Sequence, residues 1–134
     1  MQSLLPTPKK DPITTHVLDT LTGLPAHSLR VSLTLLRPLG PSTPFTALTD
    51  ADGRVTTWNV QAGPPLHEIF DNLSEHDADA KMVWSLRFDS GAYFGEGHTF
   101  WPEVEVRFFV RGKGEGVHVP VLLGPWSYTT YRGS

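Results

Sequence analysis

Cysteine is absent from this chain of 134 residues. Without thiols the protein has neither a disulfide framework nor a thiolate nucleophile, so packing alone must hold its core. Long apolar runs are also missing, because no stretch reaches the roughly 18 residues that a membrane-spanning helix requires. Residues 1–6 are too short, and too soon interrupted by proline, to form the apolar centre of a signal peptide. We therefore expect no membrane partner and no secretion.

A cationic surface is missing as well. The chain has 11 Lys and Arg residues against 14 Asp and Glu residues, which gives a formal net charge of −3. Proteins that bind nucleic acid need clustered cations to neutralise phosphates, so nucleic acid is not an expected partner. These absences direct attention to a small molecule bound in a pocket.

The remaining pattern is typical of an all-β protein. Short segments of β-branched and aromatic residues alternate with turn signals, and helical periodicity is almost absent. The length fits one domain. We expect a flexible leader over residues 1–12, which holds three prolines and two lysines, and a β-sandwich domain over residues 13–134. About eight strands are predicted, at residues 13–19, 29–37, 45–49, 55–58, 82–89, 103–110, 117–123 and 128–132.

Residues 61–81 do not fit the strand pattern. They are acidic and contain Gly63-Pro64-Pro65, which predicts a long surface excursion. Within it, residues 66–73 carry apolar side chains at helical spacing and are expected to form at most one or two turns. Pro120 lies inside a predicted strand, where its missing amide indicates an edge or a bulge.

Three polar residues stand out as candidates for chemistry. His16 and His118 lie inside predicted strands, where Val or Thr would be favoured. A lone histidine in such a place is more often a partly buried residue bonded to a backbone carbonyl than a catalytic one. Arg54 follows Asp50-Ala-Asp-Gly53, a hairpin signal that by itself predicts a solvated arginine at the start of a strand. The loop histidines are expected at the surface: His27, His67, His76 and His98.

The C-terminal segment, Tyr131-Arg-Gly-Ser134, is a further candidate for a site. Chain ends usually fray, but this one is polar, contains an aromatic side chain and follows a strand-turn-strand pattern. We expect it to be ordered and to contribute to a site.

Read together, three blocks of the sequence resemble the transthyretin-related family whose members are 5-hydroxyisourate hydrolases. The blocks are His16-Val-Leu-Asp-x-x-x-Gly-x-Pro-Ala26, Asp50-Ala-Asp-Gly-Arg54, and His118-Val-Pro120 with the closing tetrapeptide. The resemblance implies a transthyretin-like sandwich of two sheets and about eight strands, with one short helix near residues 91–95. It also implies a homotetramer built as a dimer of dimers around a channel. We expect Val119, Val121 and Leu123, with Trp126 nearby, to furnish the contact between dimers.

The resemblance further implies an enzyme that needs no cofactor and opens the ring of 5-hydroxyisourate during urate degradation. The implied catalytic residues are His16, Arg54 and His118. The implied substrate-binding residues are Tyr131, Arg132, Gly133 and Ser134. Which histidine acts as the base stays open. No metal ligands are assigned, because no histidine cluster has the spacing of zinc ligands, and a metal stays a secondary alternative.

Two other functions compete with the enzyme. A transthyretin-like carrier would bind an aromatic small molecule in the tetramer channel, but His16, Arg54 and His118 would make that channel polar. An interaction module without chemistry would leave the three polar positions unexplained. The cytosol is the default compartment, and the peroxisome is the alternative that eukaryotic relatives suggest.

Overall fold

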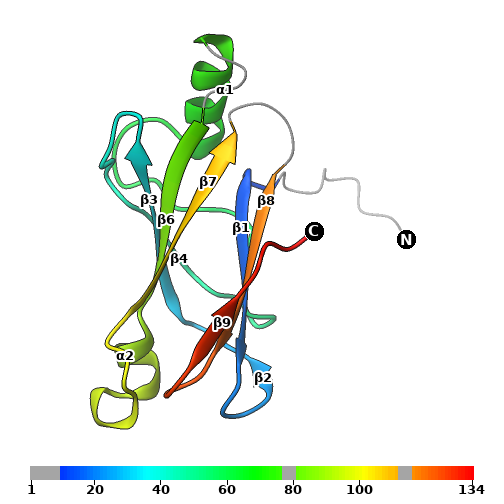
Figure 1. The fold of residues 1–134 in the computed structure, drawn as a ribbon, viewed down its shortest axis with the longest axis vertical. Helices are drawn as coiled ribbons and strands as arrows, with labels where there is room; N and C mark the ends of the chain where they lie inside the picture. The colour runs from blue at the N-terminus through cyan, green and yellow to red at the C-terminus, as the bar shows by residue number, and fades with distance from the viewer. Residues whose placement is uncertain (1–9, 77–80, 112–115) are drawn as a thin grey trace.

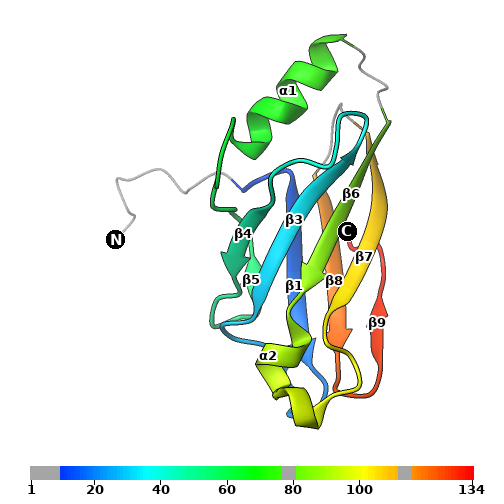
Figure 2. The same ribbon diagram turned by 90° about the vertical axis from the view of Figure 1, so that its left-hand side faces the viewer.

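The chain folds into a sandwich of two β-sheets. The computed structural model describes residues 10–76, 81–111 and 116–134. Figure 1 shows the two sheets from their edges, and Figure 2 shows one sheet covering the other, with α1 and α2 at opposite ends. None of the helices in these ranges is long and apolar enough to cross a membrane.

The first sheet has five strands arranged around β1 (Ile13–Asp19). Along its whole length β1 pairs in parallel with β8 (Val117–Leu123), which pairs in turn with β9 (Tyr128–Thr130). Two short strands pair antiparallel with β1: β2 (Leu24–Pro25) and β5 (Arg54–Val55).

The second sheet is antiparallel and has four strands. Its order is β4-β3-β6-β7. The bounds are Phe45–Leu48 for β4, Arg30–Arg37 for β3, Lys81–Phe88 for β6 and Val104–Arg111 for β7.

Alternation along the strands decides which side chains enter the core. In β1, Ile13, Thr15, Val17 and Asp19 are buried, and the residues between them are only half-buried on the outer face of the sheet. Trp84, Leu86 and Phe88 of β6 are completely buried between the sheets. Consequently, the polar side chains that β1 presents outward are positioned by a well-packed inner face.

The two ends of the sandwich are closed by helices. At one end α1 (Leu66–His76) buries Leu66 and Phe70, and the Phe70 ring stacks on Trp84 with 5.8 Å between centroids. At the other end lie α2 (Ser90–Phe94) and the 3-10 helix η1 (Glu96–His98). Tyr93 of α2 donates a hydrogen bond of 2.8 Å to the buried Asp19 at the end of β1.

The predicted elements agree with this fold in most places. Seven of the eight expected strands are present in the described residues, whereas the strand expected at residues 55–58 keeps only Val55, in β5. The two-residue β2 was not expected. The short helix expected near residues 91–95 is α2. The excursion over residues 61–81 contains a longer helix than expected, because Leu66 and Phe70 pack into the core and stabilise α1 beyond two turns. Residues 77–80 lie outside the described residues.

Of two expectations about β8, one was wrong and the other was correct only in part. Val119, Val121 and Leu123 do not form an interface: they are buried in the core, because the odd-numbered residues of β8 face inward. Pro120 is not in a bulge, since all seven residues of β8 pair with β1 in one register. On the other side of β8 the ladder with β9 stops at Val121, so Pro120 does lie at a local edge, where its missing amide interrupts the pairing with the C-terminal segment.

Most of the expected leader lies outside the described residues, which begin at Lys10. Asp11 and Pro12 are attached to the sandwich. The amide of Asp11 donates to the Thr56 carbonyl, its carboxylate accepts from the Trp58 amide at 2.8 Å, and the Pro12 carbonyl accepts from Val117. Lys10 is therefore joined to an anchored piece of backbone.

Candidate active site

Polar side chains from three neighbouring strands meet on the outer face of the first sheet. The register places His16 of β1 opposite Arg54 of β5, and Thr14 of β1 opposite His118 of β8. The imidazole rings of His16 and His118 lie with their centroids 6.5 Å apart. A compact polar group is thus assembled from segments that are far apart in the sequence.

The turn before β5 holds the backbone of Arg54 in place. One carboxylate oxygen of Asp50 accepts hydrogen bonds from the amides of Asp52 and Arg54, both at 2.9 Å. Gly53 has a φ of 75°, which favours glycine. A Cβ at this position would also collide with the carbonyl oxygen of Val17. The Gly53 carbonyl accepts from the Val17 amide at 2.8 Å, which ties the turn to β1.

The C-terminal segment lies along β8 beside His118. Beyond β9 the pairing lapses at Pro120, which has no amide to donate, and resumes in the same register where Gly133 pairs with His118. The Gly133 amide donates to the His118 carbonyl at 2.9 Å. The tail is therefore ordered, and Ser134 is brought to the polar group.

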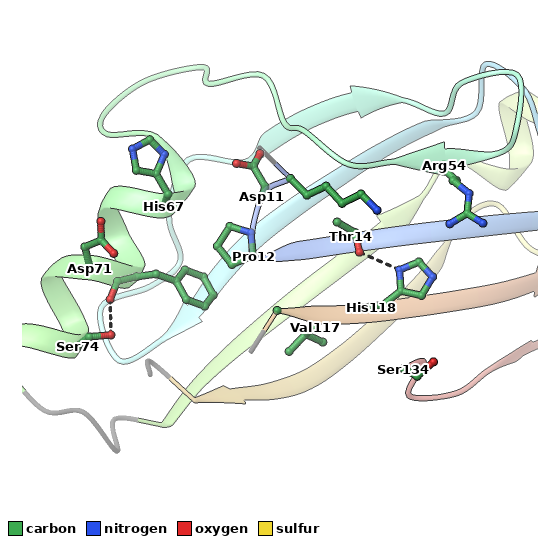
Figure 3. Close-up of a pocket in the computed structure, with 13 residues that line it drawn as sticks. Asp11, Pro12, Thr14, Arg54, His67, Asp71, Ser74, Val117, His118 and Ser134 are labelled. Carbon is green, nitrogen blue, oxygen red and sulfur yellow. Dashed lines mark hydrogen bonds between the residues drawn. The ribbon is translucent and has the colours of Figure 1, made fainter. Parts of the chain in front are cut away.

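An open cavity of about 960 Å³ lies over this group. Figure 3 shows His118, Arg54 and Ser134 at one end and the side chains of α1 at the other. The cavity is lined by Lys10, Asp11, Pro12, Thr14, Arg54, His67, Phe70, Asp71, Ser74, Gly116, Val117, His118 and Ser134.

His118 has an unusual electrostatic environment for a histidine. Its pKa lies below the ordinary value of 6.5, chiefly because partial burial disfavours the charged ring. The positive charges of Arg54, His16 and Lys10 lower this pKa further. The imidazole is consequently neutral near pH 7 and able to accept a proton.

Residues 13–133 match the protein family described as HIUase/Transthyretin. This match covers almost the whole chain. The chain belongs to the HIUase/Transthyretin family. Its site must therefore be interpreted among proteins of one fold that are named either 5-hydroxyisourate hydrolase or transthyretin.

Relatives of both kinds are found within the HIUase/Transthyretin family. The "Probable 5-hydroxyisourate hydrolase" of Schizosaccharomyces pombe is 40% identical over 139 residues, which cover 100% of both chains. The solved structure of Klebsiella pneumoniae 5-hydroxyisourate hydrolase is 25% identical, with a TM-score of 0.62 over 91% of this chain and 92% of that chain. The crystal structure of transthyretin from Sparus aurata is also 25% identical, with a TM-score of 0.69 over 92% and 97% of the two chains.

The residues singled out in the sequence fall into two groups in this family member. Arg54, His118 and Ser134 line the cavity, His16 lies next to His118, and Gly133 packs against it. Tyr131 and Arg132 are exposed and do not line the cavity. Among the described residues, neither Arg54 nor Ser134 takes part in an ion pair.

Of the residues lining the cavity, sequence reasoning assigned only Arg54, His118 and Ser134 to the site. Thr14 shares a strand face with His16 by simple alternation, so that signal was available. Lys10 was assigned to the leader, and His67 was expected to be an ordinary surface residue. Nothing in the sequence indicated that the leader and α1 border the same cavity as His118, because that depends on how distant segments pack.

Metal binding finds no support in the described ranges. There, no group of three or more His, Cys, Asp or Glu side chains lies close enough together to hold an ion. His16 and His118 form only a pair, with cationic neighbours. The residues that line the cavity supply imidazole, guanidinium, ammonium, carboxylate and hydroxyl groups.

Proposed function

We propose that this protein is a 5-hydroxyisourate hydrolase, acting in urate degradation. The reaction adds water across a ring amide of the substrate and yields 2-oxo-4-hydroxy-4-carboxy-5-ureidoimidazoline. Water oxygen attacks the amide carbonyl carbon, the C–N bond breaks, and the departing nitrogen takes up a proton. The chemistry requires a base, a group that stabilises negative charge on the carbonyl oxygen, and groups that orient the ring.

The polar lining of the cavity carries this proposal. A neutral imidazole, a guanidinium and a hydroxyl from three separate segments converge at one end of it. We assign His16 and His118 to the attacking water, and Arg54 to the substrate carbonyls, because its planar cation donates two parallel hydrogen bonds and remains charged. Relatives named as hydrolases, one of them 40% identical over the full chain, support the same activity.

The C-terminal tetrapeptide is proposed to bind the substrate. Ser134 already lines the cavity, and Gly133 permits the close approach of the tail to His118. Tyr131 is 58% exposed in the single chain, and Arg132 is exposed as well. We assign both to the substrate side in the assembled protein, where neighbouring chains would cover this face.

That assembly is proposed to be a homotetramer, a dimer of dimers. Exposed apolar side chains support an oligomer: Leu122 lies on the same face of β8 as His118, and Trp126 and Tyr128 follow it with 67% and 39% exposure. Strands β7 and β9 also leave sheet edges available for pairing. Sedimentation should show one species near four chain masses, and an active monomer would contradict the proposal.

The decisive experiment is a ring-opening assay on freshly generated 5-hydroxyisourate, followed by ultraviolet absorbance. The protein should accelerate the spontaneous reaction, and His118→Asn and Arg54→Gln should each remove most of that acceleration. His27→Asn and Arg37→Gln are matched controls, because both residues are exposed and outside the cavity. If the wild-type protein leaves the spontaneous rate unchanged, the enzyme proposal fails.

A carrier function is favoured only by the likeness to transthyretin, which lies at the level of the fold. A carrier of apolar aromatic molecules would have to bury them against Arg54 and His118, which costs free energy unless the polar groups are satisfied. Tight binding of an iodinated aromatic compound without ring-opening activity would favour the carrier instead.

The compartment stays a prediction. We place the activity in the cytosol, with the peroxisome as the alternative. Fluorescence microscopy of the tagged full-length chain in its own cell would distinguish the two.

A further inference from the structure

The side chain of Thr14 is the direct neighbour of the His118 ring. Its hydroxyl oxygen lies 2.8 Å from Nδ1 of His118, a contact drawn as a dashed line in Figure 3. The parallel register of β1 and β8 places these two residues opposite each other on the outer face of the sheet. Sheet pairing therefore holds the Thr14 hydroxyl at this nitrogen.

The other side of His118 is held by the tail. The Gly133 amide binds the His118 carbonyl, and a Cβ on Gly133 would lie only 2.8 Å from Cδ2 of the ring. The imidazole is thus confined between Thr14 on one strand and the backbone of Gly133 on the other. Within the described part of the chain, Nε2 of His118 has no hydrogen-bond partner, and it is the ring nitrogen left for a ligand in the cavity.

The surrounding charges favour one of the two neutral tautomers. The guanidinium of Arg54 lines the cavity, and the ammonium of Lys10 also acts on His118 as a positive charge. A nitrogen lone pair directed toward cations is stabilised, whereas an N–H directed toward them is not. With Nδ1 occupied by Thr14, this argument places the proton on Nδ1 and the lone pair on Nε2.

We propose that Thr14 is a positioning residue that accepts a hydrogen bond from Nδ1–H of His118 and so makes Nε2 the base of the reaction. This inference rests on the proposed function and deepens it, because it chooses between the two histidines. Nε2 takes a proton from water, and the resulting hydroxide oxygen bonds to the amide carbon of the substrate. The imidazolium then gives this proton to the departing nitrogen of the substrate as the C–N bond breaks. Thr14 itself exchanges no proton.

The same argument does not extend to His16. In the part of the chain that the structure describes, no side-chain hydrogen bond orients the His16 ring or selects its tautomer. His16 lies opposite Arg54 in the register, and its ring lies beside that of His118. We therefore assign His16 to holding the water or the substrate, not to removing the proton.

The tautomer can be read directly by nitrogen NMR of the full-length protein with labelled histidine, above the pH at which His118 titrates. His118 should show a protonated Nδ1 and an unprotonated Nε2, with its signals assigned by their loss in His118→Asn. In Thr14→Val the population should move toward the Nε2–H form. A wild-type ring protonated at Nε2, or an unchanged tautomer in Thr14→Val, would overturn the proposal. This measurement needs no activity and so stands apart from a failure of the proposed function.

Kinetics supply the second test. Thr14→Val should lower kcat by roughly tenfold or more with KM within about twofold, because a histidine in the wrong tautomer cannot act as the base. Thr14→Ser should restore most of the rate, since it keeps the hydroxyl. Thr15→Val is the structural control: it removes a 2.7 Å hydrogen bond to the Val119 carbonyl between the same two strands, but on the core face. If Thr15→Val lowers kcat as much as Thr14→Val, Thr14 has only a structural role.

Discussion

Gly133 lies so close to the imidazole of His118 that position 133 has no room for a side chain. A Cβ at position 133 would come within 2.8 Å of the ring and within 2.9 Å of Pro120. At the same time its amide binds the His118 carbonyl. The C-terminal tail thus limits the position of the His118 ring.

Gly133→Ala should impair activity more than stability. The added methyl group must displace either the His118 ring or the tail, and misplacing a base by about 1 Å can cost on the order of a hundredfold in rate. We expect kcat/KM for ring opening to fall by roughly tenfold to a hundredfold. Gly97→Ala is the matched control, because no atom lies within 4 Å of its added Cβ. Equal activity of the two variants would show that the contact does not position the base.

Gly53→Ala should destabilise the fold and displace Arg54. Gly23 has the same φ of 75°, but open space surrounds its added Cβ, whereas that of Gly53 meets the Val17 carbonyl. Gly23→Ala therefore measures backbone strain alone, about 1–2 kcal/mol. Gly53→Ala should cost clearly more, and its kcat/KM should fall as well. Thermal unfolding at equal protein concentration compares the pair, and equal losses would rule out the steric argument.

The lowered pKa of His118 should be visible in the pH dependence of the rate. If the neutral ring is the base, kcat/KM falls only as the pH drops through that lowered pKa, so the acid limb lies below 6.5. Burial is the main cause, followed by the charges of Arg54, His16 and Lys10. Lys10→Gln should move the limb toward higher pH, whereas Lys81→Gln, which removes a lysine beside Phe109 on the other sheet, should not. A limb above 6.5 would exclude His118 as a base of this kind.

The free energy of unfolding should also depend on the titration of His118. Because the folded-state pKa of His118 lies below 6.5, the unfolded chain binds more protons in the interval between the two values. The contribution of neutral His118 to the free energy of unfolding is complete above about pH 6.5, and it is lost as the pH falls through the folded-state pKa. His118→Asn should therefore flatten the fall in melting temperature on the acid side. An unchanged acid slope would contradict the shift.

Tyr93→Phe should weaken the attachment of α2 to β1. The Tyr93 hydroxyl donates to Asp19, and its loss should cost on the order of 1 kcal/mol of unfolding free energy. Burial, with the hydrogen bond and charge of Asp19, raises the pKa of Tyr93 to about 12 from 10.0. The wild-type protein should therefore lose this stability as the pH rises from 10 toward 12, and the variant should not. Tyr128→Phe is the control, since its hydroxyl has no hydrogen bond in the described ranges.

Much of the fold was predictable because strand patterns are local. The alternation in residues 29–37 predicts that Leu29, Val31, Leu33 and Leu35 share one face, and all four are buried. The face of β8 was misjudged, because Val119, Val121 and Leu123 are apolar enough for either a core or an interface. The extent of α1 was also underestimated, since its stability comes from packing on Trp84 and not from helical propensity.

The sequence by itself determined the ingredients of the site: two histidines within strands, an arginine after a glycine turn, and a polar tail. Local geometry even places Thr14 and His16 on one face of β1. Only the tertiary structure decided that Thr14 meets His118 across 104 residues of chain, that Gly133 closes the other side, and that Lys10 and α1 border the cavity. The first contact follows from the parallel register of β1 and β8 and the second from the antiparallel pairing of the tail with β8. These registers depend on how distant segments pack together, which no local pattern contains.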